Sequence, residues 1–303
     1  MPKSSSKPKS EYAIQTVTNA LRMLEVFHTE TEMGVSDLAR RLGLHKNNAF
    51  RLLATLELSG YIQQTPDTEL YHLGPRCLEL GHAFARSHTL MTQARPLLEE
   101  LAQTVGETAH LGVLRGSEVV HLDCVQPAQL VLTGSRVGER LPAHCTALGK
   151  ALVAGEFSND SLPALESQAD SNGYGAEESG ASPLGASGGK PQASSLTSSQ
   201  TTAAAISGWK LERYTASTID DATKLVEELR GIQMRGYATD LEEYSPGLRC
   251  VAAPVRDASA RVIAGLSLSG PSMRLSEEAL HGDAARAVMS AAARLSKELG
   301  SPL

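Results

Sequence analysis

A short polar run, Lys46, Asn47 and Asn48, is followed by Arg51, and these four side chains suit nucleic-acid binding. Asn and Arg make paired hydrogen bonds to base edges in the major groove, and Lys neutralises phosphate. The same run is also typical of the solvated face of an ordinary helix. The predicted helices and strands around this run distinguish a DNA-binding helix from an ordinary solvated one.

Two short helices joined by a tight turn are predicted around this run. The first covers residues 36–42, with Ser36 as its expected N-cap, and Gly43 ends it. The second runs from about residue 45 to residue 59. Its apolar residues recur at i, i+3, i+4 and i+7 and are predicted to face the core: Ala49, Leu52, Leu53 and Leu56.

A predicted hairpin follows directly, with strands at residues 61–64 and 70–73 on either side of a Thr-Pro-Asp turn. Helix, turn, helix and hairpin within residues 11–74 predict a winged helix-turn-helix, whose second helix enters the major groove. We expect Ser36 and Arg40 to contact phosphates. Phe50 is expected to pack on a sugar, on a thymine methyl or on the hairpin. The predicted DNA-binding residues are Ser36, Arg40, Lys46, Asn47, Asn48, Phe50 and Arg51.

An earlier helix is predicted from an apolar stripe that we expect to be buried, comprising Ile14, Val17, Leu21, Leu24 and Phe27. Residues 1–74 contain as many acidic as basic side chains, so one copy should bind DNA weakly. Dimerisation would double the contacts.

Length and composition indicate two domains in a cytoplasmic protein. The chain has 303 residues, a net charge of −6 and four cysteines without a Cys-x-x-Cys pair. We expect free thiols, since no secretory signal precedes them, and no membrane span, since no long apolar run occurs. A basic tail, residues 1–10, is expected to be disordered.

Behind the hairpin we expect a connector helix, residues 75–92, and then a second domain, residues 93–300. Strands alternate with helices in this domain. Residues 167–208 interrupt it with a stretch rich in Ser, Gly, Ala and Thr. This stretch cannot bury enough apolar surface to offset its ordering entropy, so it is predicted to be a disordered insert.

Several ordered blocks give the chain a resemblance to the IclR family of bacterial transcription regulators, from about residue 11 to residue 299. The blocks lie in the first helix, the helix-turn-helix and the second domain: residues 15–24, 37–46, 51–56, 141–152, 235–238 and 247–255. The resemblance implies an α+β chain, with a winged helix-turn-helix, a connector helix and a GAF-like effector-binding domain, in which helices flank an antiparallel sheet.

The resemblance also implies the partners. These are double-stranded operator DNA, a small-molecule effector such as a carboxylate or an aromatic metabolite, and a second copy of the chain, as a dimer or a dimer of dimers. Members of the family repress, activate or do both at different promoters, and repression is the sign of regulation expected here. Many relatives have Ser and Thr where this chain has Asn47 and Asn48, which indicates a different operator sequence.

The resemblance also implies an effector pocket, at the positions of this sequence that match the pocket of the family. These are Thr133, Leu141, Ala147, Leu148, Asp240, Leu248, Cys250, Ser267 and Ser269. Ser267 and Ser269 stand two apart on a predicted strand, so both hydroxyls face one side. Backbone N–H groups of Ala147 and Gly149, near a helix start, suit a carboxylate. Leucines at these positions are equally compatible with an ordinary core, and Cys250 with an inert packed thiol.

Two other classes of protein are compatible with parts of the sequence. Cys145, beside His144 near a helix start, suits a reactive thiolate, or a zinc site completed by His110 or His121. No catalytic or metal-binding motif accompanies these residues, so no catalytic residue, metal or cofactor is predicted. A DNA-binding protein without a ligand would need only about the first 75 residues, which disfavours that class.

Overall fold

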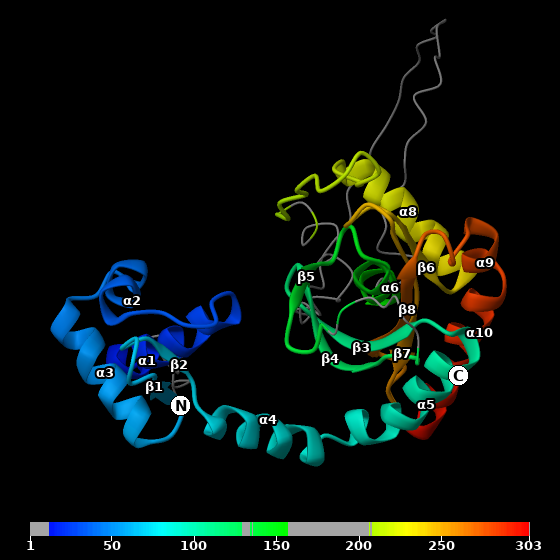
Figure 1. The fold of residues 1–303 in the computed structure, drawn as a ribbon. Coiled ribbons are helices and arrows are strands. Elements are labelled where there is room, and N and C mark those ends of the chain that lie inside the picture. Colours follow the sequence, from blue (N-terminus) through cyan, green and yellow to red (C-terminus); the bar gives the residue numbers. More distant parts are fainter. Residues whose placement is uncertain (1–11, 129–133, 135, 157–205, 207, 303) are drawn as a thin grey trace, which may run out of the picture. The chain divides into compact units, whose positions relative to one another are not determined.

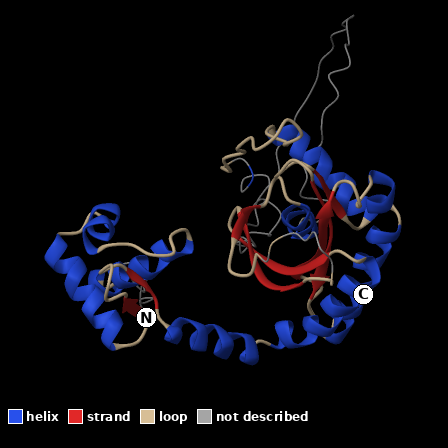
Figure 2. Ribbon diagram, viewed as in Figure 1, coloured by secondary structure: helices blue, strands red, loops and turns tan. Residues whose placement is uncertain are grey.

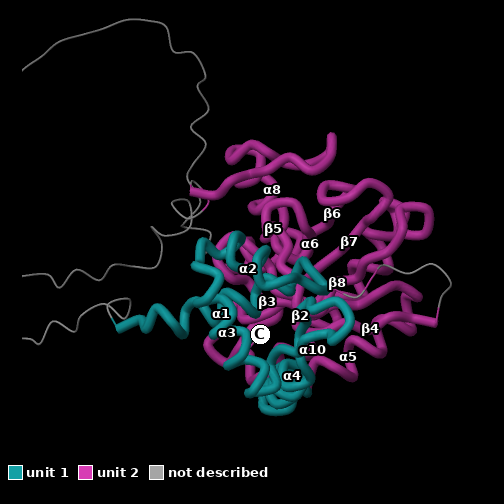
Figure 3. The backbone as a smooth tube through the Cα atoms, turned by 60° about the vertical axis from the view of Figure 1, so that its left-hand side comes forward, with its two compact units in different colours: residues 1–92 teal, residues 93–303 magenta. Residues whose placement is uncertain are grey.

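The computed structural model describes residues 12–128, 134, 136–156, 206 and 208–302. The chain forms two compact units, residues 1–92 and residues 93–303 (Figure 3). The predicted basic tail, Thr133 and nearly all of the predicted insert lie outside the described residues.

Unit 1 contains the predicted helix-turn-helix and hairpin (Figure 1). Strands β1 and β2 pair antiparallel, and Met33 bridges to Tyr71 beside them. Met23, Leu38, Ala49, Leu53 and Ile62 are wholly buried or nearly so at the centre of this unit. The elements are α1 (Gln15–Glu25), the short 3-10 helix η2 (Val26–His28), α2 (Val35–Leu42), α3 (Lys46–Leu58), β1 (Ile62–Gln64), β2 (Tyr71–Leu73) and α4 (Pro75–Ser87).

The turn between α2 and α3 depends on Gly43. Its φ of 66° is left-handed, a conformation that glycine adopts without a side-chain penalty. The N–H of Leu44 donates to the carbonyl of Ala39 and closes the turn. The prediction of Ser36 as N-cap was wrong, because the helix starts one residue earlier, at Val35, after Gly34.

The predicted burial of the α1 stripe was wrong for three of its five residues. Ile14, Val17 and Leu21 are 66%, 52% and 57% exposed, whereas Phe27 is buried. Met23 occupies the centre of the core from the opposite face of α1. Periodicity identifies an apolar face, but none of the described residues covers Ile14, Val17 and Leu21.

Unit 2 is built on a curved, wholly antiparallel sheet in the order β5-β4-β3-β8-β7-β6. Its strands are β3 (Thr108–Arg115), β4 (Glu118–Val125), β5 (Arg140–Pro142), β6 (Ala238–Leu241), β7 (Leu248–Arg256) and β8 (Val262–Pro271). Its helices are α5 (Thr89–Val105, which begins in unit 1), α6 (Ala147–Glu156), α8 (Ala222–Arg235), α9 (Glu277–His281) and α10 (Asp283–Glu298). These elements give the expected α+β fold.

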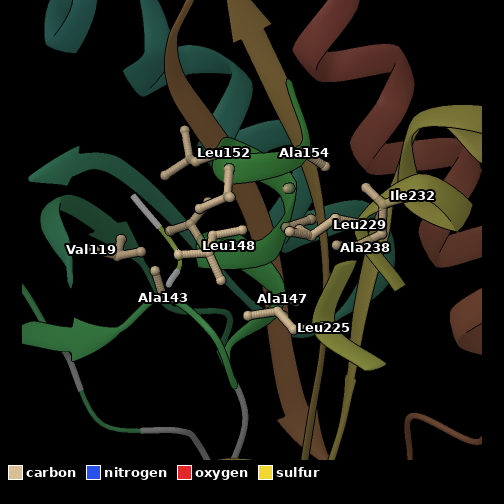
Figure 4. Packing of buried hydrophobic residues seen from close by; sticks show 14 residues of the cluster. Val119, Ala143, Ala147, Leu148, Leu152, Ala154, Leu225, Leu229, Ile232 and Ala238 are labelled. Carbon is tan, nitrogen blue, oxygen red and sulfur yellow. The ribbon is translucent and has the colours of Figure 1, made fainter. Parts of the chain in front are cut away.

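Helix α6 lies within the curve of the sheet, and α10 packs on β7 and β8 (Figure 2). Two glycines of the sheet let α6 pack closely against it. A Cβ atom on Gly112 or on Gly265 would stand 2.7 Å from a methyl carbon of Leu148. Leu148, Leu152 and Leu225 belong to the apolar cluster around α6 (Figure 4). The sheet therefore has a polar-lined end beside the start of α6 and an apolar floor beneath it.

No helix among the described residues is long and apolar enough to cross a membrane.

Candidate functional site

The predicted DNA-reading residues lie on the exposed side of α2 and α3. Helix α3 is held by Ala49 and Leu53, which are fully buried. The side chains that point away from this core are all exposed: Ser36, Arg40, Lys46, Asn47, Asn48, Phe50 and Arg51. Polar groups at the start and on the outer face of α3 are thus presented on a rigid support.

One of these polar side chains, Arg40, already has a partner. Arg40 forms an ion pair with Asp37 one turn earlier, so a contact from Arg40 to phosphate would have to replace that pair. Asn48, Phe50 and Arg51 line an open groove together with Thr16 and Asn19 of α1. Helix α1 therefore borders the same surface.

In unit 2, a small cavity of about 30 Å³, partly open to solvent, lies at the start of α6. It is lined by eight of the nine residues predicted for the effector pocket, and Thr133 is not described. The predicted residues that line it are Leu141, Ala147, Leu148, Asp240, Leu248, Cys250, Ser267 and Ser269.

The register of the sheet brings the polar residues together. Asp240 lies opposite Cys250, and Cys250 opposite Ser269 on β8. Ser267 is two residues from Ser269 and opposite His110 on β3. Directly opposed residues in antiparallel strands share a face, as do residues two apart. All five side chains therefore project from one side of the sheet.

Asp240 is only 1% exposed. Its Oδ1 accepts a hydrogen bond from the Glu243 N–H at 2.7 Å. Burial, together with the nearby charge of Glu243, raises the pKa of Asp240 to about 7. Near neutral pH this carboxyl is therefore divided between a form that only accepts hydrogen bonds and a protonated form that can also donate one.

Glu243 is anchored on the side away from the cavity. It pairs with Lys150 of α6, whose side chain is 1% exposed. Burial raises the pKa of Glu243, while Lys150 opposes that rise. The Thr218 hydroxyl donates to the Glu243 carbonyl at 2.6 Å. These contacts fix the loop that carries Asp240 and Tyr244.

The reactive-thiolate interpretation is contradicted. Burial, reinforced by Asp240 and Glu243, raises the pKa of Cys145 to about 12, so it remains a thiol. Burial also raises the pKa of Cys250, whose thiol is hydrogen-bonded with Ser269. Within the described part of the chain, no cluster of three or more His, Cys, Asp or Glu side chains could hold a metal ion.

One detail of the predicted carboxylate contact is also wrong. The N–H of Gly149 already donates to the Thr146 hydroxyl at 3.3 Å. That hydroxyl in turn donates to the Pro142 carbonyl at 2.8 Å. The Gly149 amide is therefore used to cap α6 and is not free for a ligand.

Four lining residues were missed by sequence reasoning: His121, Arg136, Thr146 and Tyr244. His121 and Arg136 belong to β4 and the turn after it, on the other side of β3 from the predicted serines. Their position depends on strand register, which periodicity does not give. Alternation along β4 predicts on which face of the strand His121 lies, but it does not predict which residues of other strands lie beside it.

The chain matches two family models, "Bacterial transcriptional regulator IclR C-terminal" over residues 82–172 and 181–297, and "IclR helix-turn-helix domain" over residues 16–66. It is 32% identical to the HTH-type transcriptional regulator XynR of Escherichia coli K12, with 95% of this chain and 98% of XynR covered. It is 27% identical to the transcriptional repressor IclR of the same strain, with 88% and 83% covered.

A crystal structure of a transcriptional regulator from Rhodococcus sp. RHA1 superposes with a TM-score of 0.73 at 26% identity, covering 95% of this chain and 98% of that one. The family models span most of the chain and include both the DNA-binding and the C-terminal parts. The chain therefore belongs to the IclR family of bacterial transcriptional regulators.

Proposed function

We propose that this protein is a homodimeric repressor, whose two α3 helices read a pseudo-palindromic operator and whose affinity for it changes when a small metabolite binds in unit 2. The observation that carries the proposal is the exposed polar surface of α3 above a buried apolar support. A helix-turn-helix presents its second helix to the major groove in this manner.

Base reading is assigned to Asn47, Asn48 and Arg51, and phosphate contact to Lys46, Ser36 and Arg40. Asn and Arg offer paired hydrogen bonds that distinguish adenine and guanine. Phe50 is assigned to apolar contact with a sugar or thymine methyl, since the residue is 55% exposed. One of the two Escherichia coli relatives, IclR, is a transcriptional repressor, which supports the proposal that this protein represses transcription.

The homodimer is proposed from apolar surface that unit 1 leaves uncovered. Helix α4 has no buried residue, and its Leu78, Leu80 and Phe84 are exposed. Val17 and Leu21 of α1 are exposed as well. Exposed apolar side chains in this number are typical of helices that pack against a partner. A second copy would also double the DNA contacts of residues 1–74, which contain as many acidic as basic side chains.

Effector binding is assigned to the cavity of unit 2 and its eight predicted lining residues. A metabolite changes operator affinity only as far as it prefers one arrangement of the dimer over another. Helix α4, which joins the two units in sequence, is the proposed transmitter of that preference.

The experiment that tests DNA reading is footprinting on DNA flanking the protein's own gene. The wild-type protein should protect two half-sites about 10 base pairs, or a multiple of this, apart. The variant Arg51→Ala should lose this protection while remaining folded. Absence of a protected site, or equal protection by the variant, would contradict operator reading by α3.

The effector arm is tested with Ser267→Phe, which fills the cavity. This variant should bind the operator normally and fail to respond to any metabolite that alters binding by the wild type. A normal response would place the effector elsewhere. If no metabolite alters binding by the wild type, the protein is a ligand-independent DNA-binding protein.

A further inference from the structure

Two elements of unit 1 pack beside α3, and they differ in the groups that they offer to DNA. One is helix α1 and the other is the hairpin of β1 and β2. Residues 61–73 of the hairpin contain no Lys or Arg. Its turn carries two exposed acids, Asp67 and Glu69, and the imidazole of His72 is hydrogen-bonded with the Thr65 hydroxyl at 3.3 Å. Since every phosphate of DNA is negative, the hairpin offers two charges that repel it and no lysine or arginine that attracts it.

The groove beside α1 offers the opposite set of groups. It is open, has a volume of about 400 Å³ and is lined by two residues of α1 and six of α3: Thr16, Asn19, Asn48, Phe50, Arg51, Leu52, Ala54 and Thr55. Among these described residues none is acidic, and Arg51 alone carries a charge. The charge that they place on the groove is therefore positive.

Asn19 of α1 is oriented as a hydrogen-bond donor. Nε2 of Gln15, one turn earlier, donates to Oδ1 of Asn19 at 3.0 Å. This hydrogen bond engages the acceptor of Asn19 and leaves Nδ2, whose two N–H groups can only donate. Phosphate oxygens accept hydrogen bonds, so Asn19 presents the group that the backbone of DNA requires.

Arg51, in the same groove, is not held by an acid. The arginines of α2 are paired, Arg40 with Asp37 and Arg41 with Glu30. No acidic side chain in the described part of the chain forms an ion pair with Arg51. The guanidinium of Arg51 is therefore available to DNA, whereas a contact from either arginine of α2 has to replace an ion pair.

The face of α1 that lines this groove is separate from the face assigned above to the homodimer. Val17 and Leu21 are four residues apart, so they share one face of the helix, and neither lines the groove. Thr16 and Asn19 are three residues apart and share another face, which lines it. Helix α1 can therefore contact DNA and a second copy of the chain at the same time.

We propose that α1, and not the hairpin, binds the sugar-phosphate backbone of the operator, through the amide of Asn19 and the hydroxyl of Thr16. The DNA strand that borders the major groove lies against α1, while α3 reads the bases. Arg51, which lines the same groove, adds its positive charge there. This inference rests on the proposed operator binding by α3, and it names the element that binds the backbone beside it.

The test measures the Kd of the full chain for DNA by fluorescence anisotropy, with the fragment protected in footprinting and with an unrelated duplex of the same length. Asn19→Asp keeps the acceptor for Gln15 but replaces the donor by a charged oxygen. It should weaken binding to both duplexes by about tenfold or more at low salt, and by less at high salt, because salt screens the repulsion. Asn19→Ala, which only loses the donor, should weaken binding by a smaller factor. Binding by Asn19→Asp as tight as that of the wild type would overturn the inference.

A matched pair of threonines locates the contact on one face of α1. Thr16→Val removes a hydroxyl from the groove. Thr18→Val is the control, because the Thr18 hydroxyl donates to the Ile14 carbonyl at 3.3 Å and Thr18 does not line the groove. Both changes keep a β-branched side chain, so the helix is perturbed equally. Thr16→Val should weaken binding to both duplexes and Thr18→Val should not, and equal losses would contradict the assignment.

The hairpin is tested with the double variant Asp67→Asn, Glu69→Gln, which removes both of its acidic charges. This variant should bind DNA at least as tightly as the wild type, since only repulsion is lost. Weaker binding would show that the hairpin contacts DNA through these side chains, and the inference would be wrong.

The two duplexes separate this inference from the proposed function. If Arg51→Ala loses the protected site while Asn19→Asp binds like the wild type, operator reading by α3 stands and the role of α1 is wrong. If no sequence is protected but Asn19→Asp binds the unrelated duplex more weakly, the backbone contact stands and operator reading fails. Sedimentation of Asn19→Asp tests the other occupant of the groove. Loss of the dimer with unchanged affinity for DNA would assign the groove to a second copy and overturn the inference.

Discussion

The α3 surface and the unit 2 cavity both present polar side chains, but they do so under opposite conditions. On α3 the polar groups are exposed and the neighbouring Ala49 and Leu53 supply the stability. In the cavity, Asp240 and Ser267 are themselves buried among the residues that hold the sheet together. Substitutions of exposed α3 residues should therefore change DNA binding without changing the free energy of unfolding. Substitutions of the cavity residues should change both metabolite binding and the free energy of unfolding.

The largest expected effect tests the support beneath α3. Leu53→Ala should lower the free energy of unfolding of unit 1 by about 2–5 kcal/mol, because it removes a wholly buried side chain. Leu58→Ala in the same helix, where the leucine is 91% exposed, should change it by less than about 0.5 kcal/mol. Urea unfolding of both variants measures the difference, and similar losses would refute the assigned orientation of α3.

Close packing under the cavity is tested by Gly265→Ala. The added methyl meets Leu148, so unit 2 should lose about 1–3 kcal/mol of stability. In Gly81→Ala the methyl meets no atom within 4 Å and lies inside α4, where alanine should stabilise by about 0.5–1 kcal/mol. Thermal unfolding of the two variants should therefore shift in opposite directions, and a shift in the same direction would disprove the packing argument.

On the exposed side of the comparison, Arg51→Ala should cost about 1–3 kcal/mol of specific operator binding and leave unfolding unchanged. Lys46→Ala should weaken binding to all sequences alike and reduce the salt dependence by about one counterion. Titration at several salt concentrations distinguishes the two. A sequence-independent loss in Arg51→Ala would remove it from base reading.

Two buried groups of the cavity should make stability depend on pH, with slopes of opposite sign that largely cancel in the wild type. Since the folded-state pKa of His121 is depressed to about 4, the unfolded chain alone takes up this proton between pH 6.5 and 4, and stability falls on acidification. Asp240 has the opposite sign. Its pKa is raised to about 7, so the folded state alone holds the proton above pH 3.8, and stability falls as the pH rises toward 7.

Each group contributes a slope of about 1.4 kcal/mol per pH unit within its window. His121→Leu should therefore flatten the loss of stability below pH 6.5, and Asp240→Asn should steepen it. Chemical unfolding at a series of pH values measures both slopes against wild type. Parallel profiles for all three proteins would show that neither residue titrates differently on folding.

The same contrast explains how much the sequence predicts. Helix α3 and the hairpin follow from periodicity and turn residues, because those signals are local. The exposure of Val17 and Leu21 could not be predicted, since a stripe reveals a face but not what covers it. The spacing of Ser267 and Ser269 places them on one side of a strand, and family resemblance supplies their neighbours.

His110 and Arg136 could not be found in this manner. His110 joins Ser267 only through the pairing of β3 with β8, strands that are far apart in the sequence. Arg136 reaches the cavity from a turn, where side-chain direction has no periodic signal. Buried polar groups depend on partners from several strands, so their role becomes visible only once the register is known.

Gly112 and Gly265 of the sheet carry no side chain, which sets how deep Leu148 sits and hence the depth of the cavity proposed to bind the effector. The double variant Gly265→Ala, Leu148→Val would add a methyl group to the sheet and remove one from α6. It would change the shape of the cavity and leave the polar residues that line it unchanged. The preference of this sensor among metabolites of different size can thus be redesigned independently of the operator that it reads.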